Sequence, residues 1–183
     1  MEKLVFVKPS LDLKEKILEY KNEHFEYSEY EIHGSSMLDK LEYEEWLDRI
    51  ENNKDIADTF IVIRQSDNKI IGIIDIRYEL YNDFLKNYAG HIGYSVRPTE
   101  RRKGYNKINL YLGLLECRKQ GLKNVMLDCE KNNLGSAKTI QALGGVLERE
   151  YLDDELNEME QVYWIDVDKS IEENYEKYKS YIE

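Results

Sequence analysis

Cysteine and long apolar runs are scarce in this chain of 183 residues, and basic residues are outnumbered by acids, so that each of these features argues against a class of protein. The two cysteines, Cys117 and Cys129, have no metal-ligand spacing, so we expect reduced thiols in or near the core and no metal site. No apolar run is long enough for a signal peptide or a membrane span, which favours a cytoplasmic protein without a membrane partner. Lys and Arg number 26 against 37 Asp and Glu, and this net charge of -11 disfavours a nucleic-acid partner.

The composition that is present fits one folded domain spanning residues 1–183. Hydrophobic residues make up 42% of the chain, which is enough for a core. Charged residues make up 34% and are spread along the chain rather than gathered in blocks, which argues against extensive disorder. The length is that of a single ordinary domain. The surplus of acid is compatible with a cationic partner such as an amine.

Hydrophobic periodicity and turn residues predict an order of alternating strands and helices. The helix predicted after Pro98 is apolar over so much of its circumference that we expect it to be buried against a sheet. The predicted strands are 4–7, 59–64, 70–78, 90–96, 125–129, 146–152 and 160–167. The predicted helices are 11–25, 43–51, 103–120, 134–143 and 170–182. This order indicates an α/β (α+β mixed) domain with a mixed sheet.

One segment, between the third long strand and the long helix, departs from the acidic background. Gly104 allows close approach of the backbone, and a helix start presents free N–H groups and the positive end of the helix dipole. Basic side chains beside it would add charge-assisted hydrogen bonds. The segment therefore predicts a pyrophosphate site, with a solvated basic turn as the alternative. Its basic residues are Arg97, Arg101, Arg102, Lys103 and Lys107, set against one acid, Glu100.

Two stretches resemble motifs of a known family. Gly90-His91-Ile92-Gly93-Tyr94-Ser95-Val96-Arg97-Pro98, followed by Arg101-Arg102-Lys103-Gly104-Tyr105, resembles the central motif of the GNAT superfamily, Arg/Gln-x-x-Gly-x-Gly/Ala after a strand. Asn133-Leu134-Gly135-Ser136, with the later Gly144-Gly145, resembles the second motif of that family. The resemblance covers about residues 60–167, is specific over 90–148, and looks closest to a poorly characterised bacterial branch of predicted acetyltransferases.

The resemblance implies a fold and an activity. The fold is a GNAT-like central, mostly antiparallel sheet flanked by helices, closed by a C-terminal helix at about 170–182. The activity is transfer of an acetyl group from acetyl-CoA to an amine of a small molecule or peptide, by direct transfer in a ternary complex. Dimers are common among members of the family, so a homodimer is one expected assembly.

The resemblance also implies a set of CoA-binding residues. The backbone of Ser95, Val96 and Arg97 would pair with the pantetheine arm. Asn133 and Ser136 would line the side of the thiol. The residues expected around the pyrophosphate are Arg101, Arg102, Lys103, Gly104, Tyr105 and Asn106, with Lys107 one step later.

Two departures from the family pattern keep a second function open. Asn106 stands where the family has Gly or Ala, and Ile140 stands where many members carry a tyrosine that protonates the CoA thiolate. Both departures favour a GNAT-like module that senses acyl-CoA without turnover. A third reading is an interaction protein that uses its tyrosine-rich C-terminal helix as the contact.

Direct transfer needs a base for the acceptor amine, and two residues are candidates. His91 would share one face of its strand with Gly93 and Ser95, near the expected thioester, with a structural histidine as the alternative. Asp75 interrupts the apolar run 70–76, where a lone carboxylate is unfavourable unless it is satisfied or used. The alternative for Asp75 is a side chain that faces solvent. Tyr94, Glu130 and Tyr151 are further options.

Overall fold

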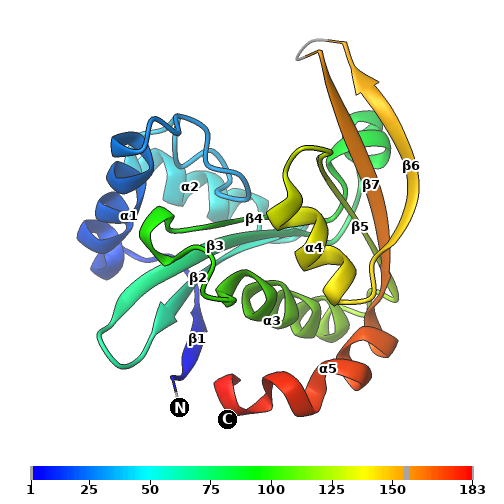
Figure 1. Cartoon of the computed structure of the whole chain (residues 1–183). Coiled ribbons are helices and arrows are strands. Elements are labelled where there is room, and N and C mark those ends of the chain that lie inside the picture. The colour runs from blue at the N-terminus through cyan, green and yellow to red at the C-terminus, as the bar shows by residue number, and fades with distance from the viewer. Residues whose placement is uncertain (1, 155–156, 183) are drawn as a thin grey trace.

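The computed structural model describes residues 2–154 and 157–182, and Figure 1 shows their arrangement. The predicted order of elements is confirmed, with ends that differ by a few residues. The strands are β1 (Leu4–Val7), β2 (Ala57–Arg64), β3 (Lys69–Arg77), β4 (Ile92–Val96), β5 (Asn124–Glu130), β6 (Val146–Asp153) and β7 (Glu158–Asp166). The helices are α1 (Lys14–Glu26), α2 (Tyr43–Asn53), α3 (Tyr105–Lys119), α4 (Leu134–Ala142) and α5 (Val167–Ile182). Short helical segments are η1 (Leu11–Leu13), η2 (Leu85–Ala89) and η3 (Pro98–Glu100).

The strands form two antiparallel sheets that meet at β4 and β5. One sheet has the order β1-β2-β3-β4 and the other has the order β5-β7-β6. No hydrogen-bonded ladder joins β4 to β5 in the described part of the chain, so each presents an open edge to the other. Two hydrogen bonds between His91, just before β4, and Met126 of β5 connect the two sheets. The gap in the ladder beyond them leaves backbone groups free to pair with another chain or ligand.

Helices cover both faces of the first sheet and one face of the second, and they enclose two apolar clusters. Helices α1 and α2 lie on one side of the first sheet, over a cluster that includes Trp46, while α3, α4 and α5 lie on the other side (Figure 1). The prediction that the long helix is buried is confirmed, because α3 buries both Leu110 and Tyr111 completely. Its Gly113 packs so closely on β3 that a Cβ there would lie 2.6 Å from Cδ1 of Ile74.

The loop between α1 and α2 is fixed against β4 by a contact that only glycine permits. Gly34 has φ +66°, and a Cβ on it would lie 2.2 Å from the backbone carbon of Gly93. Trp46 of α2 holds the same loop by donating its indole N–H to the carbonyl of Ser35 at 2.7 Å. The loop therefore covers the middle of β4 on the side of α1 and α2.

Among the described residues, no helix is both long enough and apolar enough to cross a bilayer.

Candidate active site

The basic loop, residues 101–104, ends β4 and leads directly into α3. Arg102 has φ +61° and Gly104 has φ +88°, so the backbone turns twice through the left-handed region before the helix begins. Within the described chain, no backbone N–H group of residues 102–106 donates a hydrogen bond to the protein. Free N–H groups, the positive end of the α3 dipole and exposed cations therefore lie together at this loop, and these are the features with which proteins hold phosphates.

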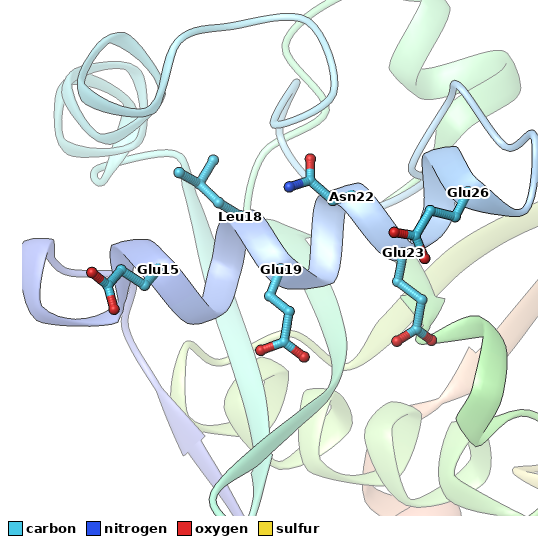
Figure 2. A pocket seen from close by; sticks show the side chains of 6 residues that line it. All are labelled: Glu15, Leu18, Glu19, Asn22, Glu23 and Glu26. Atoms are coloured by element: carbon cyan, nitrogen blue, oxygen red, sulfur yellow. The ribbon is translucent and has the colours of Figure 1, made fainter.

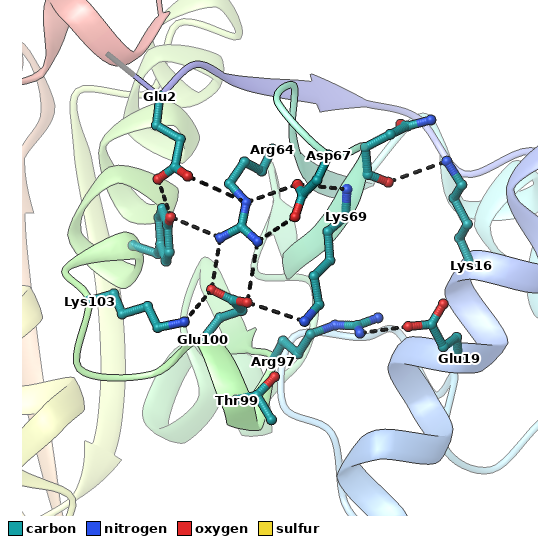
Figure 3. Close-up of polar contacts among 12 residues, drawn as sticks. Glu2, Lys16, Glu19, Arg64, Asp67, Lys69, Arg97, Thr99, Glu100 and Lys103 are labelled. Atoms are coloured by element: carbon teal, nitrogen blue, oxygen red, sulfur yellow. Dashed lines mark hydrogen bonds and ion pairs between the residues drawn. The ribbon is translucent and has the colours of Figure 1, made fainter.

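A buried carboxylate anchors the basic loop from below (Figure 3). Glu100 is 4% exposed and accepts hydrogen bonds from Arg64 at 2.9 Å, Lys103 at 2.9 Å and Lys69 at 3.2 Å. Burial opposes ionisation of Glu100, but these three donors overcome it and lower its pKa to about 2. The carboxylate stays charged at neutral pH and fixes the position of Lys103 beside the loop.

The basic residues named from the sequence divide into two groups. Arg97 is 2% exposed and pairs with Glu19 at 2.8 Å and Glu23 at 3.0 Å, so it ties α1 to the end of β4. Arg101 donates from Nε to the carbonyl of Val96 at 3.2 Å and forms a bidentate ion pair with Glu29. In contrast, the described chain gives Arg102 and Lys107 no ion pair or side-chain hydrogen bond, which leaves both cations available at the helix start.

A depression lined mainly by acids lies on α1, and its Glu23 reaches the segment that precedes the basic loop. It has a volume of about 480 Å³ and is lined by Glu15, Leu18, Glu19, Asn22, Glu23 and Glu26 (Figure 2). In it, Glu19 and Glu23 point the same way, toward their partner Arg97. Glu23 also accepts from the backbone and hydroxyl of Thr99. These two acids therefore hold the helix in place.

The open edge of β4 carries the residues expected near the pantetheine and the thiol. Arg97 donates its backbone N–H to Ile71 of β3 and Ser95 pairs with Ile73, so alternation turns the backbone groups of Tyr94 and Val96 toward the open edge. The hydroxyl of Tyr94 lies 2.8 Å from Oγ of Ser136 at the start of α4. The hydroxyl of Tyr94 thus lies at the gap between β4 and β5.

The second predicted motif forms the start of α4, across the gap from the basic loop. Asn133 caps this helix, and its Oδ1 accepts from the backbone N–H of Ser136 at 3.1 Å. The side chain of Asn106 reaches Thr139 of α4, with Nδ2 3.5 Å from the hydroxyl oxygen. Ile140 is fully buried in the core. The two motifs thus meet at the gap, while Ile140 offers no proton donor there.

His91 bridges the two sheets. Its ring Nδ1 accepts the backbone N–H of Met126 at 3.0 Å, and the backbone N–H of His91 donates to the carbonyl of Met126 at 2.8 Å. A nitrogen that accepts an N–H carries no proton, so the ring proton is on Nε2 and the only basic nitrogen is already engaged. Burial, together with the positive charge of Arg77, lowers the pKa of His91 to about 4. The geometry therefore favours the structural alternative for His91.

We expect His91→Ala to lower the free energy of unfolding by about 1–3 kcal/mol, because it leaves the buried N–H of Met126 without an acceptor. Urea unfolding checks this value. The matched control is His33→Ala, whose side chain is 66% exposed and whose loss is expected to change stability by less than about 0.5 kcal/mol. Normal stability with a large loss of turnover would instead return His91 to the role of base.

Asp75 is buried rather than exposed to solvent, so the solvent-facing alternative for it is wrong. It is 7% exposed, accepts from the hydroxyl of Thr59 at 3.0 Å and lies 3.3 Å from Nε of Arg77. Burial raises the pKa of Asp75, against the opposing effects of Arg77 and Thr59. Arg77 in turn donates to the carbonyls of Ala89 and Gly90. Asp75 thus orients an arginine that holds the turn before β4.

Two further carboxylates, which no sequence motif marks, lie on β5 and β7. Asp128 alternates with Leu127 and Cys129 of the core, so its side chain points to the face away from α3 and α4. Burial raises the pKa of Asp128 to about 6, against the opposing charge of Arg77. Burial and four neighbouring acids raise the pKa of Glu160 to about 7. Both carboxyl groups titrate near neutral pH, where a general base is most effective.

Known proteins share both the sequence pattern and the fold of this chain. Residues 17–144 match the model of the acetyltransferase (GNAT) family. No curated protein sequence matches significantly. Solved structures share the fold, among them the ribosomal-protein-S5-alanine acetyltransferase of Vibrio fischeri, with a TM-score of 0.68 and 20% identity over 91% of this chain and 93% of that one.

Two further structures show the range of acceptors among similar folds. A ribosomal L7/L12 α-N-protein acetyltransferase in complex with CoA has a TM-score of 0.70 and 14% identity, over 91% of this chain and 95% of that one. A spermidine N-acetyltransferase chimera from Vibrio cholerae and hSSAT has a TM-score of 0.69 and 12% identity, over 92% of this chain and 98% of that one. From its family match and its fold, this chain belongs to the GNAT acetyltransferase family.

Proposed function

We propose that this protein transfers an acetyl group from acetyl-CoA to an amine, by direct attack in a ternary complex. The observation that carries the proposal is the row of unpaired N–H groups at residues 102–106, placed at the end of a strand edge that is itself open. Pyrophosphate fits the first feature and an amide-bearing pantetheine arm fits the second. Structural neighbours include acetyltransferases solved with CoA and with acetyl-CoA, which supports the same ligand here.

The proposed CoA site uses the residues that the sequence singled out, in revised roles. The backbone of residues 102–106 binds the pyrophosphate, and Arg102 and Lys107 supply unpaired cations. Val96, together with Tyr94, pairs with the pantetheine arm along the open edge of β4. Asn133 and Ser136 line the side of the thiol. Arg97, Arg101, Lys103 and Tyr105 hold the loop and its neighbours in place through ion pairs and hydrogen bonds.

The chemistry needs a proton acceptor for the amine and a proton donor for the sulfur. Asp128 takes a proton from the ammonium group, and the free amine then attacks the thioester carbonyl. The C–N bond forms, the C–S bond breaks, and the hydroxyl of Tyr94 protonates the departing thiolate. The nitrogen then gives its second proton to water, and Tyr94 and Asp128 return to their starting protonation states by exchange with solvent. Tyr94 fits the role of proton donor because its hydroxyl lies at the gap between β4 and β5, whereas Ile140 has no hydroxyl to donate. Burial raises the pKa of Tyr94, so that it keeps its proton until the thiolate forms.

The test is CoA release from acetyl-CoA in the presence of a panel of amines and N-terminal peptides, together with calorimetric titration of CoA. Amine-dependent thiol release above the rate of hydrolysis supports the proposal. Tight binding of CoA without turnover on any acceptor would identify a sensing module, the function that Asn106 and Ile140 left open. Absence of CoA binding would contradict the site.

A further inference from the structure

A group of five acids lies on one face of the second sheet, beside the proposed base. We call it the acidic face, and its members are Asp128, Glu130, Asp153, Glu158 and Glu160. In the register, Glu130 lies directly opposite Glu160, and Asp153 lies directly opposite Glu158. Like charges placed opposite each other in antiparallel strands are destabilising. The fold therefore concentrates negative charge here at some expense in its own stability.

Glu160 is the member of the acidic face that most clearly lacks a partner. It is 6% exposed, yet within the described chain it makes no hydrogen bond and no ion pair. The charged form of a largely buried carboxylate without a partner is unfavourable, so the group either takes up a proton or is joined by a cation. The nearby cations are engaged elsewhere, since Arg77 holds Asp75 and two carbonyls, and Arg149 contacts Glu148 and the carbonyl of Asn87.

An aromatic row borders the acidic face. Tyr151 lies beside Glu160 in the register, its ring centroid is 5.0 Å from that of Tyr88, and Tyr88 is 5.9 Å from Phe84. Tyr88 is 43% exposed and Phe84 is 63% exposed, so these rings are accessible from solvent. Aromatic faces next to carboxylates bind ammonium groups and the alkyl chains attached to them.

The spread of the acids points to an organic cation rather than a metal ion. Among the described residues, no group of three or more His, Cys, Asp or Glu side chains is arranged to hold a metal. Asp128 lies opposite Val162, two residues from Glu160, and such diagonal neighbours lie about 7–8 Å apart in an antiparallel pair. A short alkyl chain with an ammonium group at each end spans that separation.

We propose that the acceptor is an aliphatic amine with a second cationic group, and that Glu160 and the aromatic row bind that second group while Asp128 receives the reacting amine. This inference depends on the proposed function in one respect only, namely that the bound amine is acetylated. Cation binding at Glu160 is a property of this face and is measured independently of acetyl-CoA.

The test compares 1,4-diaminobutane with butylamine, which has the same carbon chain and one ammonium group fewer. We expect the wild-type KM for the diamine to be lower by about 10–100-fold, the value of one charge-assisted hydrogen bond to a buried carboxylate. Glu160→Gln is expected to remove this preference by raising the KM for the diamine to that for butylamine. Glu150→Gln is the matched control, because it removes one charge from the other face of the same sheet, where Glu150 pairs with Lys131.

Calorimetry of 1,4-diaminobutane with the CoA-free protein separates this inference from the proposed function. Diamine binding that Glu160→Gln abolishes and Glu150→Gln retains supports the cation site even if no acetyl transfer occurs. Equal KM values for the two amines, or diamine affinity that is unchanged in Glu160→Gln, would overturn the inference while leaving an acetyltransferase in place. Absence of diamine binding in the wild type would overturn it as well.

The same carboxylate predicts a pH dependence of stability. The pKa of Glu160 is about 7 in the folded protein and higher than in the unfolded chain, so the folded state holds the proton longer. Stability is therefore lost as pH rises from the ordinary glutamate range through about 7. We expect Glu160→Gln to match wild type near pH 5 and to melt about 2–8 °C higher near pH 8.5.

The difference between the two melting curves isolates Glu160, because the other groups are common to both proteins. The charged and titratable groups around Glu160 are Asp128 and Glu130 on β5, Arg149, Tyr151 and Asp153 on β6, Glu158 on β7, Tyr88 on η2 and Arg77 on β3. A difference in melting temperature that does not change between pH 5 and pH 8.5 would show that Glu160 is not a desolvated carboxylate. Such a result would remove the basis for a cation site.

Discussion

Asp128→Asn is expected to lower kcat by about 10²–10⁴-fold, because it removes the proposed base while keeping the shape of the side chain. The affinity for CoA should stay within about twofold, since Asp128 lies on the face away from the basic loop. Initial rates with saturating acetyl-CoA and amine check the first value, and calorimetry checks the second.

The pH profile distinguishes a base from a merely structural carboxylate. In the wild type, kcat/KM should rise with pH through about 6, the pKa of Asp128, and this limb should be absent in Asp128→Asn. Glu160→Gln should keep the limb, which separates the two neighbouring acids. A variant Asp128→Asn that retained the wild-type kcat would show that another group, or water alone, takes the proton.

Gly104→Glu is expected to raise the Kd for CoA at least about 100-fold, because it places a negative charge where the pyrophosphate binds. The change also strains the backbone, since Gly104 has φ +88°. Gly121→Glu is the matched control at the other end of α3: Gly121 has φ +81° and, like Gly104, has open space around its missing Cβ.

Both glycine variants should lose about 1–2 kcal/mol of stability from the left-handed backbone, and only Gly104→Glu should lose CoA. Calorimetric titration of CoA into the three proteins, with urea unfolding of each, makes the comparison. Equal CoA affinity in Gly104→Glu and Gly121→Glu would place the pyrophosphate elsewhere on the molecule.

Most of the fold is predictable from local sequence, because each element is marked by its own periodicity and by its own stop residues. The long apolar helix that Gly121 ends, and the strand that Pro98 ends, illustrate this. The basic loop is equally local, since its two ends and its glycine are contiguous. These features are confirmed because they depend on residues close together in the chain.

The roles of single side chains depend on contacts between distant segments, and sequence reasoning placed several of them differently. The sequence predicts that Arg97 binds phosphate, but in the structure Glu19 and Glu23 of α1 pair with its guanidinium group. Nothing in the local sequence distinguishes Glu160 from the other acids, and only the strand register places it opposite Glu130. A weak signal for Asp128 was present, because it interrupts the apolar run Val125–Leu127 as Asp75 interrupts its own strand.

A crystal structure with CoA bound tests the central claim most directly. The account predicts the pyrophosphate within hydrogen-bond distance of the N–H groups of residues 102–106, the pantetheine arm along the open edge of β4, and the sulfur near the hydroxyl of Tyr94. Arg101 should then release the carbonyl of Val96, which it contacts in the ligand-free protein. CoA bound away from the start of α3, or a sulfur that does not enter the gap between β4 and β5, would contradict the account.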